Sequence, residues 1–194
     1  MSTNSLVAYL RENGSVVSSY VHYDGYATGV GEMLLENYTS DKCARDLATT
    51  LGYASSLGET VTASHEDRAN TDEAIVHTSF EEFEEYVREN SYLEYVYVWK
   101  NGEWMVSSYT LEVEGVGRYA EYNSIWNGWE KLVTVYIREG NKTVARWKRM
   151  VAEGNLPHEY LDHANELDVI VSRYHRAAMA VVVDNVVSEW RESV

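Results

Sequence analysis

The sequence predicts an α+β protein: a four-stranded antiparallel sheet with helices on one face, followed by a C-terminal extension of about three helices. Two Asn-Gly dipeptides, Asn13-Gly14 and Asn101-Gly102, each separate two β-rich runs and supply the positive φ angles of a type I′ hairpin turn. Helical apolar spacing lies between the two hairpins and again after residue 116. Strands and helices grouped in this way are typical of a sheet covered on one side.

The first hairpin and two helices account for residues 6–52. The strands are Leu6–Leu10 and Val16–Tyr23, and the second strand ends in the string His22-Tyr23-Asp24-Gly25-Tyr26. A helix then starts at Thr28 or Gly29 and continues to Tyr38. Ser40 or Asp41 caps the next helix, in which Cys43, Leu47 and Leu51 share an apolar face that buries the cysteine. Gly52 is placed to end it.

The second hairpin follows a long loop and one strongly amphipathic helix. Residues 53–75 have a loop composition, and Ser79 caps a helix over Phe80–Asn90 whose apolar stripe contains Phe83 and Val87. Tyr92–Lys100 and Glu103–Val113 then form the hairpin.

A domain boundary is expected at Gly115-Val116-Gly117, which divides the chain into residues 1–115 and 116–194. Helices are predicted over Ser124–Arg138, over Thr143–Glu153 and from Pro157 towards Glu192, with Gly140 and Gly154 as stops. In the last helix an apolar stripe repeats at spacings of four and three, which fits helix packing within one chain. Its one polar member, Asn185, favours a homo-oligomer held through the C-terminal helices. The stripe is Leu167, Val171, Tyr174, Ala178, Val181 and Asn185.

The charge is strongly negative and unevenly distributed. The net charge is −15, and residues 1–115 hold 20 acidic and 6 basic side chains, a balance of −14. A surplus of this size disfavours direct binding to nucleic-acid phosphates and favours a basic partner or imitation of a polyanion. The single cysteine excludes an internal disulfide. Met1–Ser5 is polar, and Asp184 interrupts the most apolar stretch, so we expect neither a signal peptide nor a membrane span.

Two kinds of small-ligand site can be drawn near the end of the first hairpin. His22 and Asp24 lie on one face if the strand continues, and with His65, Glu66 and Asp67 they could hold a hydrolytic metal ion. The alternative is a structural role in which Asp24-Gly25 makes the turn.

A second site would use the glycines of the strand-to-helix segment. Gly25, Gly29 and Gly31 precede a helix, where backbone N–H groups can bind an anion, with His22 and Tyr26 as side walls. A tight turn without a ligand is again the alternative. Nucleophile-elbow, phosphate-loop and dinucleotide signatures are absent from the sequence, so we expect a non-enzymatic protein without a cofactor.

Several ordered motifs resemble a family of small accessory proteins common in phage and prophage genomes. The resemblance covers residues 1–110. This sequence departs from the family pattern at Tyr23, where relatives usually have Trp, and after Arg68, where a polar tract stands in place of their usual glycine-glutamate. It implies a phage-type accessory protein made in the cytoplasm of a bacterial host, and no established activity. The motifs are His22–Tyr26, Gly31-x-x-Leu-Leu-Glu-x-Tyr38, Ser55-Ser-Leu-Gly-Glu59, His65-x-Asp-Arg68, Glu82-Phe-x-Glu-Tyr86 and Glu94-Tyr-x-Tyr97.

These observations lead to one main functional hypothesis and three alternatives. The main one is a counter-defence protein that binds a host protein or a small anionic signalling ligand. The alternatives are an acidic imitation of DNA, a metal-dependent hydrolase and a structural part of the virion. The 16 tyrosines against 2 phenylalanines favour an interface or an oligomer. The expected ligand-binding residues are His22, Asp24, Gly25, Tyr26, Gly29, Gly31, His65 and Arg68.

Overall fold

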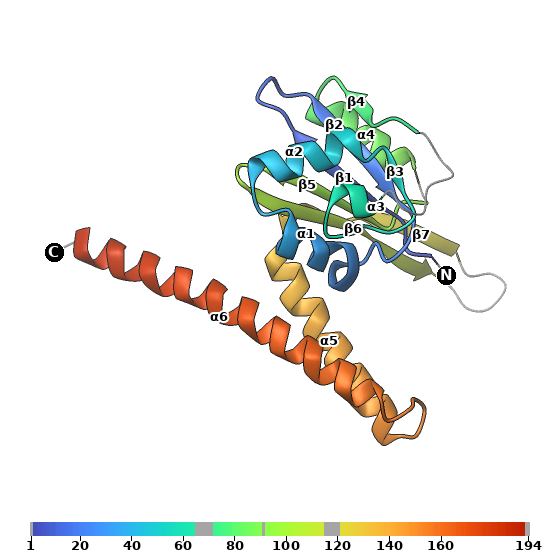
Figure 1. Ribbon diagram of the computed structural model, residues 1–194, viewed down its shortest axis with the longest axis vertical. Coiled ribbons are helices and arrows are strands. Elements are labelled where there is room, and N and C mark those ends of the chain that lie inside the picture. Colours follow the sequence, from blue (N-terminus) through green and yellow to red (C-terminus); the bar gives the residue numbers. More distant parts are fainter. Residues whose placement is uncertain (1, 65–71, 91, 115–120, 193–194) are drawn as a thin grey trace. The chain divides into compact units, whose positions relative to one another are not determined.

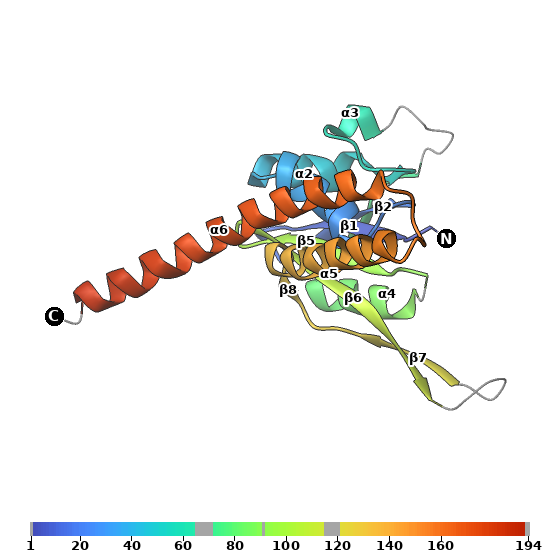
Figure 2. The same cartoon turned by 90° about the horizontal axis from the view of Figure 1, so that it is seen from below.

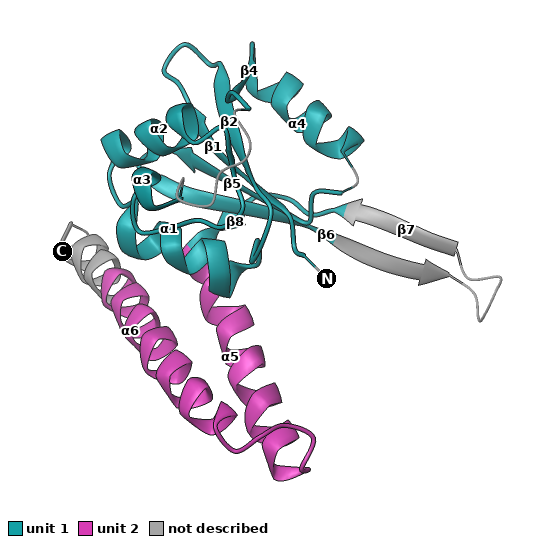
Figure 3. Ribbon diagram, turned by 45° about the vertical axis from the view of Figure 1, so that its right-hand side comes forward, with its two compact units in different colours: residues 1–132 teal, residues 133–194 magenta. Residues whose placement is uncertain are grey.

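The protein consists of two compact units. The computed structural model describes residues 2–64, 72–90, 92–114 and 121–192. Unit 1 comprises residues 1–132 and unit 2 residues 133–194 (Figure 3). The boundary that we expected at residues 115–117 lies outside the described residues.

Unit 1 is built on a mixed β-sheet rather than on the four antiparallel strands expected from the sequence (Figure 1). The strand order is β3-β2-β1-β5-β6-β7, with β4 paired to β2 and β8 paired to β6. The strands are β1 (Ser5–Leu10), β2 (Val16–Val21), β3 (Tyr53–Ala54), β4 (Ile75–His77), β5 (Tyr95–Lys100), β6 (Glu103–Glu114), β7 (Glu121–Trp126) and β8 (Glu130–Lys131).

Both predicted hairpins are confirmed, but the pairing between them is parallel. β1 pairs antiparallel with β2, and β5 with β6, whereas β1 and β5 run parallel from Ser5↔Tyr95 onwards. A hairpin turn sets the relative direction of only the two strands that it joins. The directions of β1 and β5 depend on the helices between them, which is why local turn residues did not reveal this pairing.

The two hairpin turns differ in their geometry. Asn101 and Gly102 have φ values of 56° and 82°, as a type I′ turn requires. In the first turn Gly14 has a φ of 86°, and the side chain of Asn13 instead accepts a hydrogen bond from the backbone N–H of Ser15 at 3.1 Å. The type I′ prediction is therefore right for the second turn and wrong for the first.

Helices cover both faces of the sheet, not one (Figure 2). On one face the Ser19 hydroxyl donates to the Ala48 carbonyl at 2.9 Å and joins β2 to α2. On the other face Phe83 of α4 lies in a core with Leu6 and Val96. β1 is buried at consecutive positions, as expected for a strand covered on both sides. The helices of unit 1 are the π-helical turn η1 (Ala27–Gly31), α1 (Glu32–Asn37), α2 (Asp41–Thr50), α3 (Val61–Ser64) and α4 (Phe80–Glu89).

Side-chain caps begin α2 and α4 as predicted. The backbone N–H of Cys43 donates to the hydroxyl of Ser40, and that of Glu82 donates to Ser79. The side chain of Cys43 is exposed, contrary to our expectation, because α2 turns Ala44, Leu47 and Ala48 towards the sheet.

Unit 2 is formed by two long helices where three were expected. They are α5 (Leu132–Ala152), which begins at the last residue of unit 1, and α6 (Tyr160–Glu192). The helix predicted from Ser124 begins only at Leu132, because residues 121–126 pair with β6. Gly140 continues α5 instead of ending it. It is buried and lies four residues from Tyr136 and from Val144, so a missing side chain on that face is compatible with close helix packing.

Candidate functional site

The backbone of the predicted motif is occupied by contacts within the protein. Asp24 adopts a left-handed conformation with a φ of 57°, and its carbonyl accepts the N–H of Val30 at 2.8 Å. The N–H groups of Gly29 and Gly31 donate to the Tyr26 carbonyl at 3.0 and 3.3 Å. The N–H groups expected to bind an anion therefore already have acceptors.

The glycines of this segment allow close approach of other parts of unit 1. A Cβ on Gly25 would lie 2.6 Å from the Thr3 carbonyl oxygen, and one on Gly29 would lie 2.3 Å from that of Asp24. Gly31 is buried, and a Cβ there would lie 3.0 Å from the side chain of Leu132. All three positions have a structural reason to be glycine.

The structure places His22 and Asp24 in different surroundings. His22 Nδ1 lies 3.1 Å from the Tyr20 hydroxyl, and its ring lies against that of Tyr23 at 4.4 Å. Asp24 accepts a hydrogen bond from the Tyr26 hydroxyl at 3.1 Å. The other two expected ligand-binding residues, His65 and Arg68, lie outside the described residues. Within the described ranges, no group of three His, Cys, Asp or Glu side chains is arranged to hold a metal ion.

A groove of about 480 Å³ adjoins the motif and is acidic. Asp24, Tyr26 and Gly29 line it, together with Glu32, Glu36 and Glu59. Four carboxylates around one groove oppose the entry of an anion. This side of the motif suits a small anionic ligand poorly.

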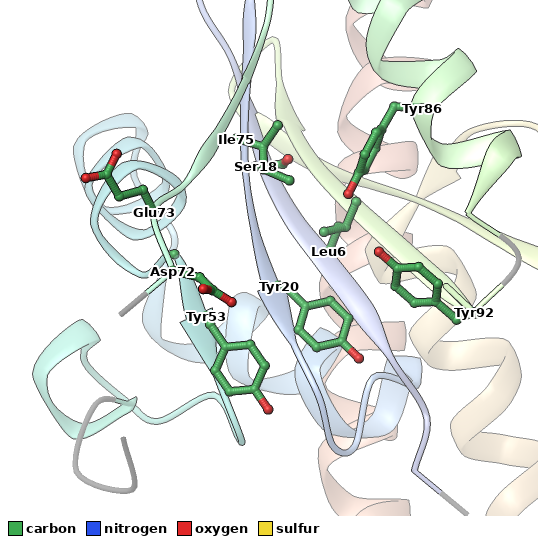
Figure 4. A pocket seen from close by; sticks show the side chains of 10 residues that line it. Leu6, Ser18, Tyr20, Tyr53, Asp72, Glu73, Ile75, Tyr86 and Tyr92 are labelled. Carbon is green, nitrogen blue, oxygen red and sulfur yellow. The ribbon is translucent and has the colours of Figure 1, made fainter. Parts of the chain in front are cut away.

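A second pocket, here called the tyrosine pocket, has a volume of about 460 Å³ and lies on the sheet face that α4 covers. Four tyrosines from separate segments surround it, Leu6 and Ser18 line it from the sheet, and Asp72 and Glu73 lie opposite Tyr86 and Tyr92 (Figure 4). The volume is in the range of small-molecule sites. The four tyrosines are Tyr20, Tyr53, Tyr86 and Tyr92.

Strand pairing positions the first two tyrosine rings. Tyr20 on β2 faces the same side of the sheet as Ser18, because side chains alternate along a strand. Tyr53 on β3 pairs with Tyr20, so their rings stack with centroids 5.5 Å apart and an angle of 30° between the planes. Cross-strand register thus produces a paired aromatic wall.

The other two rings come from the chain around the end of α4. Tyr92 lies edge-on to Tyr20, with centroids 6.1 Å apart and an interplanar angle of 69°. Tyr86 on α4 points towards Tyr92 and shares a side-chain hydrogen bond with it (Figure 4). The side chain of Tyr92 is 49% exposed, which leaves this side of the pocket open to solvent.

The hydroxyls of Tyr20 and Tyr86 stay protonated at neutral pH. Burial, followed by the nearby Tyr53 and Tyr92, raises the pKa of Tyr20 to about 12. Burial, followed by the hydrogen bond with Tyr92, raises the pKa of Tyr86 to about 12 as well. Among the described lining residues, Asp72 and Glu73 carry charge and no basic side chain does. The pocket therefore offers ring faces, hydroxyl donors and negative charge.

A buried polar pair fixes the sheet edge beside the pocket. Ser18 Oγ lies 3.1 Å from His77 Nε2, and both side chains are buried. The His77 ring lies against Phe83 and Tyr86, with centroids 5.2 and 5.0 Å away. Burial lowers the pKa of His77, so its ring is neutral at pH 7. The pair joins β4 to β2 and helps to position Ser18 and Tyr86.

Sequence reasoning did not identify the tyrosine pocket. Its members are spread from residue 6 to residue 92, and none belongs to the group of residues that we expected to bind a ligand. The available signal was the excess of tyrosine over phenylalanine, which indicated aromatic rings with one polar edge at a binding surface.

Comparisons with known proteins found no match to a family model, to a curated protein or to a solved structure. Over the described residues, no helix has both the length and the apolar character needed to cross a membrane.

Proposed function

We propose that this protein acts by binding, and that the tyrosine pocket holds a small planar ligand that is neutral or positively charged. The observation that carries the proposal is the arrangement of four tyrosine rings around about 460 Å³ beside the carboxylate of Asp72 (Figure 4). Rings of this kind stack on flat ligands and attract cations through their faces. Tyrosine hydroxyls can also hydrogen-bond a heterocycle.

Charge decides between ligand classes. A phosphate-bearing ligand would meet the carboxylate of Asp72, which lines the pocket. Such an arrangement repels an anion and attracts a cation by the same Coulomb energy. The proposal therefore replaces the small anionic ligand that we expected from the glycine-rich segment with a neutral or cationic one.

The biological setting is proposed from the motif resemblance over residues 1–110. We place the binding activity in a phage accessory protein that acts in the host cytoplasm, where capture of a small host molecule would blunt a defence response. The absence of recognisable catalytic motifs in the sequence supports binding rather than turnover.

Three indole compounds that differ in charge test the proposal: tryptamine (cationic), tryptophol (neutral) and indole-3-acetate (anionic). Isothermal titration calorimetry of the full chain is expected to show saturable tryptamine binding, weaker tryptophol binding and no indole-3-acetate binding. The Tyr53→Ala variant should bind tryptamine about tenfold less tightly, a loss of about 1.4 kcal/mol, because one ring of the stacked pair is gone.

Two further variants serve as controls. Tyr53→Phe keeps the ring and should bind nearly as wild type. Tyr23→Ala removes a tyrosine that is 47% exposed and outside the pocket, and should bind like wild type. Circular dichroism confirms that each variant is folded. Failure of all three compounds to bind would overturn the proposal, and so would tryptamine binding that Tyr53→Ala leaves intact.

A further inference from the structure

His77 contacts two of the side chains that line the tyrosine pocket. Its Nε2 lies 3.1 Å from Ser18 Oγ, and its ring lies against that of Tyr86 with centroids 5.0 Å apart and an interplanar angle of 52°. Ser18 lines the pocket from the sheet, and Tyr86 lines it from α4 (Figure 4). A change in the His77 ring therefore acts on two walls of the pocket at once.

The His77 ring is held tightly in this position. The residue is 2% exposed, and Phe83 lies against its ring with centroids 5.2 Å apart. Its backbone pairs with Val16 of β2, and Ser18 on the same strand is 0% exposed. Because protein interiors are close-packed, the ring cannot shift or change its hydrogen bonding without moving these neighbours.

The described groups around His77 favour a neutral ring. Those that face it from β2 and α4 are uncharged apart from Glu82, and the rest of β4 is apolar. The Glu82 side chain is exposed, and its carboxylate accepts the Thr78 N–H at 2.7 Å. Burial lowers the pKa of His77, and the charge of Glu82 raises this pKa by a smaller amount. The uncharged groups are Ser18, Phe83 and Tyr86.

A proton on His77 would change both the hydrogen bonding and the charge of this site. In the neutral ring, either Nε2 or the Ser18 hydroxyl can be the donor. In the protonated ring both nitrogens donate, so Ser18 must accept and its own hydrogen must turn to another acceptor. A charge in such a buried position is also costly, and movement of the ring towards water relieves that cost. Both responses disturb Ser18 or Tyr86.

We propose that His77 is a proton-sensitive positioning residue of the tyrosine pocket: its neutral ring holds the pocket in the form that binds ligand, and its protonated ring gives a form that binds ligand less tightly. The inference rests on the function proposed above and adds regulation to it. Ligand affinity is full above pH 6.5, the ordinary pKa of histidine, and falls as the pH decreases through the lowered pKa of His77 in the folded protein. Because such coupling is reciprocal, ligand binding releases protons at acid pH.

The pH dependence of tryptophol binding tests the inference. Tryptophol is uncharged, so a change in the charge of Asp72 has little effect on its binding. In calorimetry of the full chain, the wild-type Kd should be at least about twofold higher at about pH 5 than at about pH 7.5, because the binding-competent fraction is smaller. His77→Gln keeps a polar side chain beside Ser18 but takes up no proton, and its Kd should be nearly equal at the two pH values.

His175→Gln, at an exposed histidine of unit 2, is the matched control and should keep the wild-type pH dependence. Circular dichroism confirms that each variant is folded at both pH values. The wild type also gives a measurement that depends on no variant. At about pH 5, tryptophol binding should release protons, detected as a heat of binding that differs between buffers of different ionisation enthalpy.

An equal wild-type Kd at the two pH values would overturn the inference. An equal rise of Kd in His77→Gln, or binding without proton release, would overturn it as well. In each of these cases tryptophol still binds at about pH 7.5, so the proposed function stands. Failure of tryptophol to bind at about pH 7.5 would also overturn this inference, whereas saturable tryptamine binding would still support the proposed function.

Discussion

At the scale of single residues, the motif of residues 22–31 is explained by backbone geometry. The Gly25 carbonyl accepts the Tyr97 hydroxyl at 2.7 Å, and its N–H donates to Thr3 at 2.8 Å. Gly29 is required by the nearby carbonyl of Asp24. The sequence could locate this segment as unusual. It could not show that the segment's groups face inward, because their partners come from residues 3 and 97, far away in the chain.

The tyrosine pocket shows the opposite case. The excess of tyrosine in the composition indicated a binding surface, but the sequence did not show which tyrosines form it or where it lies. Tyr20 and Tyr53 become neighbours only through the parallel pairing of β2 with β3. β3 has two residues and lies within a stretch whose composition predicts a loop. A strand this short leaves no periodic pattern, so its partner could not be assigned.

His77 should make the stability of the protein depend on pH below its ordinary pKa of 6.5. Burial lowers the pKa of His77 in the folded state. Below pH 6.5, His77 therefore binds a proton in the unfolded chain that it does not bind in the folded chain. Its contribution to stability is present above pH 6.5 and is lost as the pH falls from there towards the lowered folded pKa. Urea unfolding of wild type and His77→Gln, followed from about pH 7 to about pH 5, should show a steeper loss in the wild type.

The carboxylates of this acidic protein add a pH dependence that both proteins share, so the difference between them reports His77. His175→Gln, at an exposed histidine, is the matched control and should keep the wild-type slope. Equal slopes for wild type and His77→Gln would contradict a pKa of His77 that burial lowers in the folded protein.

At the scale of elements, the sequence predicted features set by neighbouring residues correctly, but it did not predict the pairing of strands far apart in the chain. The caps Ser40 and Ser79 and both hairpins follow from residues within one turn of each other. Parallel pairing of β1 with β5, helices on both faces and the pairing of β7 with β6 depend on contacts far apart in sequence. Gly140 is instructive because a residue that often ends helices lies buried in the middle of α5 instead.

Ser79→Ala should destabilise the protein by about 1 kcal/mol, the usual cost of losing a side-chain cap. The Ser79 hydroxyl accepts the Glu82 N–H at 3.1 Å, and the Glu82 carboxylate accepts the Thr78 N–H at 2.7 Å. Both contacts start α4, which carries Phe83 and Val87 into the core. The measurement is the free energy of unfolding in urea. Ser56→Ala, at an exposed serine outside any cap, should change it by less than about 0.5 kcal/mol. Equal stability of the two variants would contradict a stabilising cap.

At the scale of the whole molecule, the two proposals concern one unit. Every described residue that lines the tyrosine pocket belongs to unit 1, and so does His77. The pocket joins segments that lie far apart in the sequence, from Leu6 to Tyr92. A ligand that it holds therefore binds the folded protein and has no equivalent site in the unfolded chain.

Ligand binding should therefore stabilise the protein by an amount that the affinity sets. Tryptamine at about 100 times its wild-type Kd should raise the free energy of unfolding by about 2.7 kcal/mol, because a ligand that binds only the folded state shifts the equilibrium by mass action. In Tyr53→Ala, which is expected to bind about tenfold less tightly, the same concentration should add about 1.4 kcal/mol. Urea unfolding followed by circular dichroism, with and without tryptamine, measures both values, and indole-3-acetate at the same concentration should change neither protein. Equal stabilisation of the two proteins by tryptamine would show that it acts outside the tyrosine pocket, and the binding proposal would be wrong.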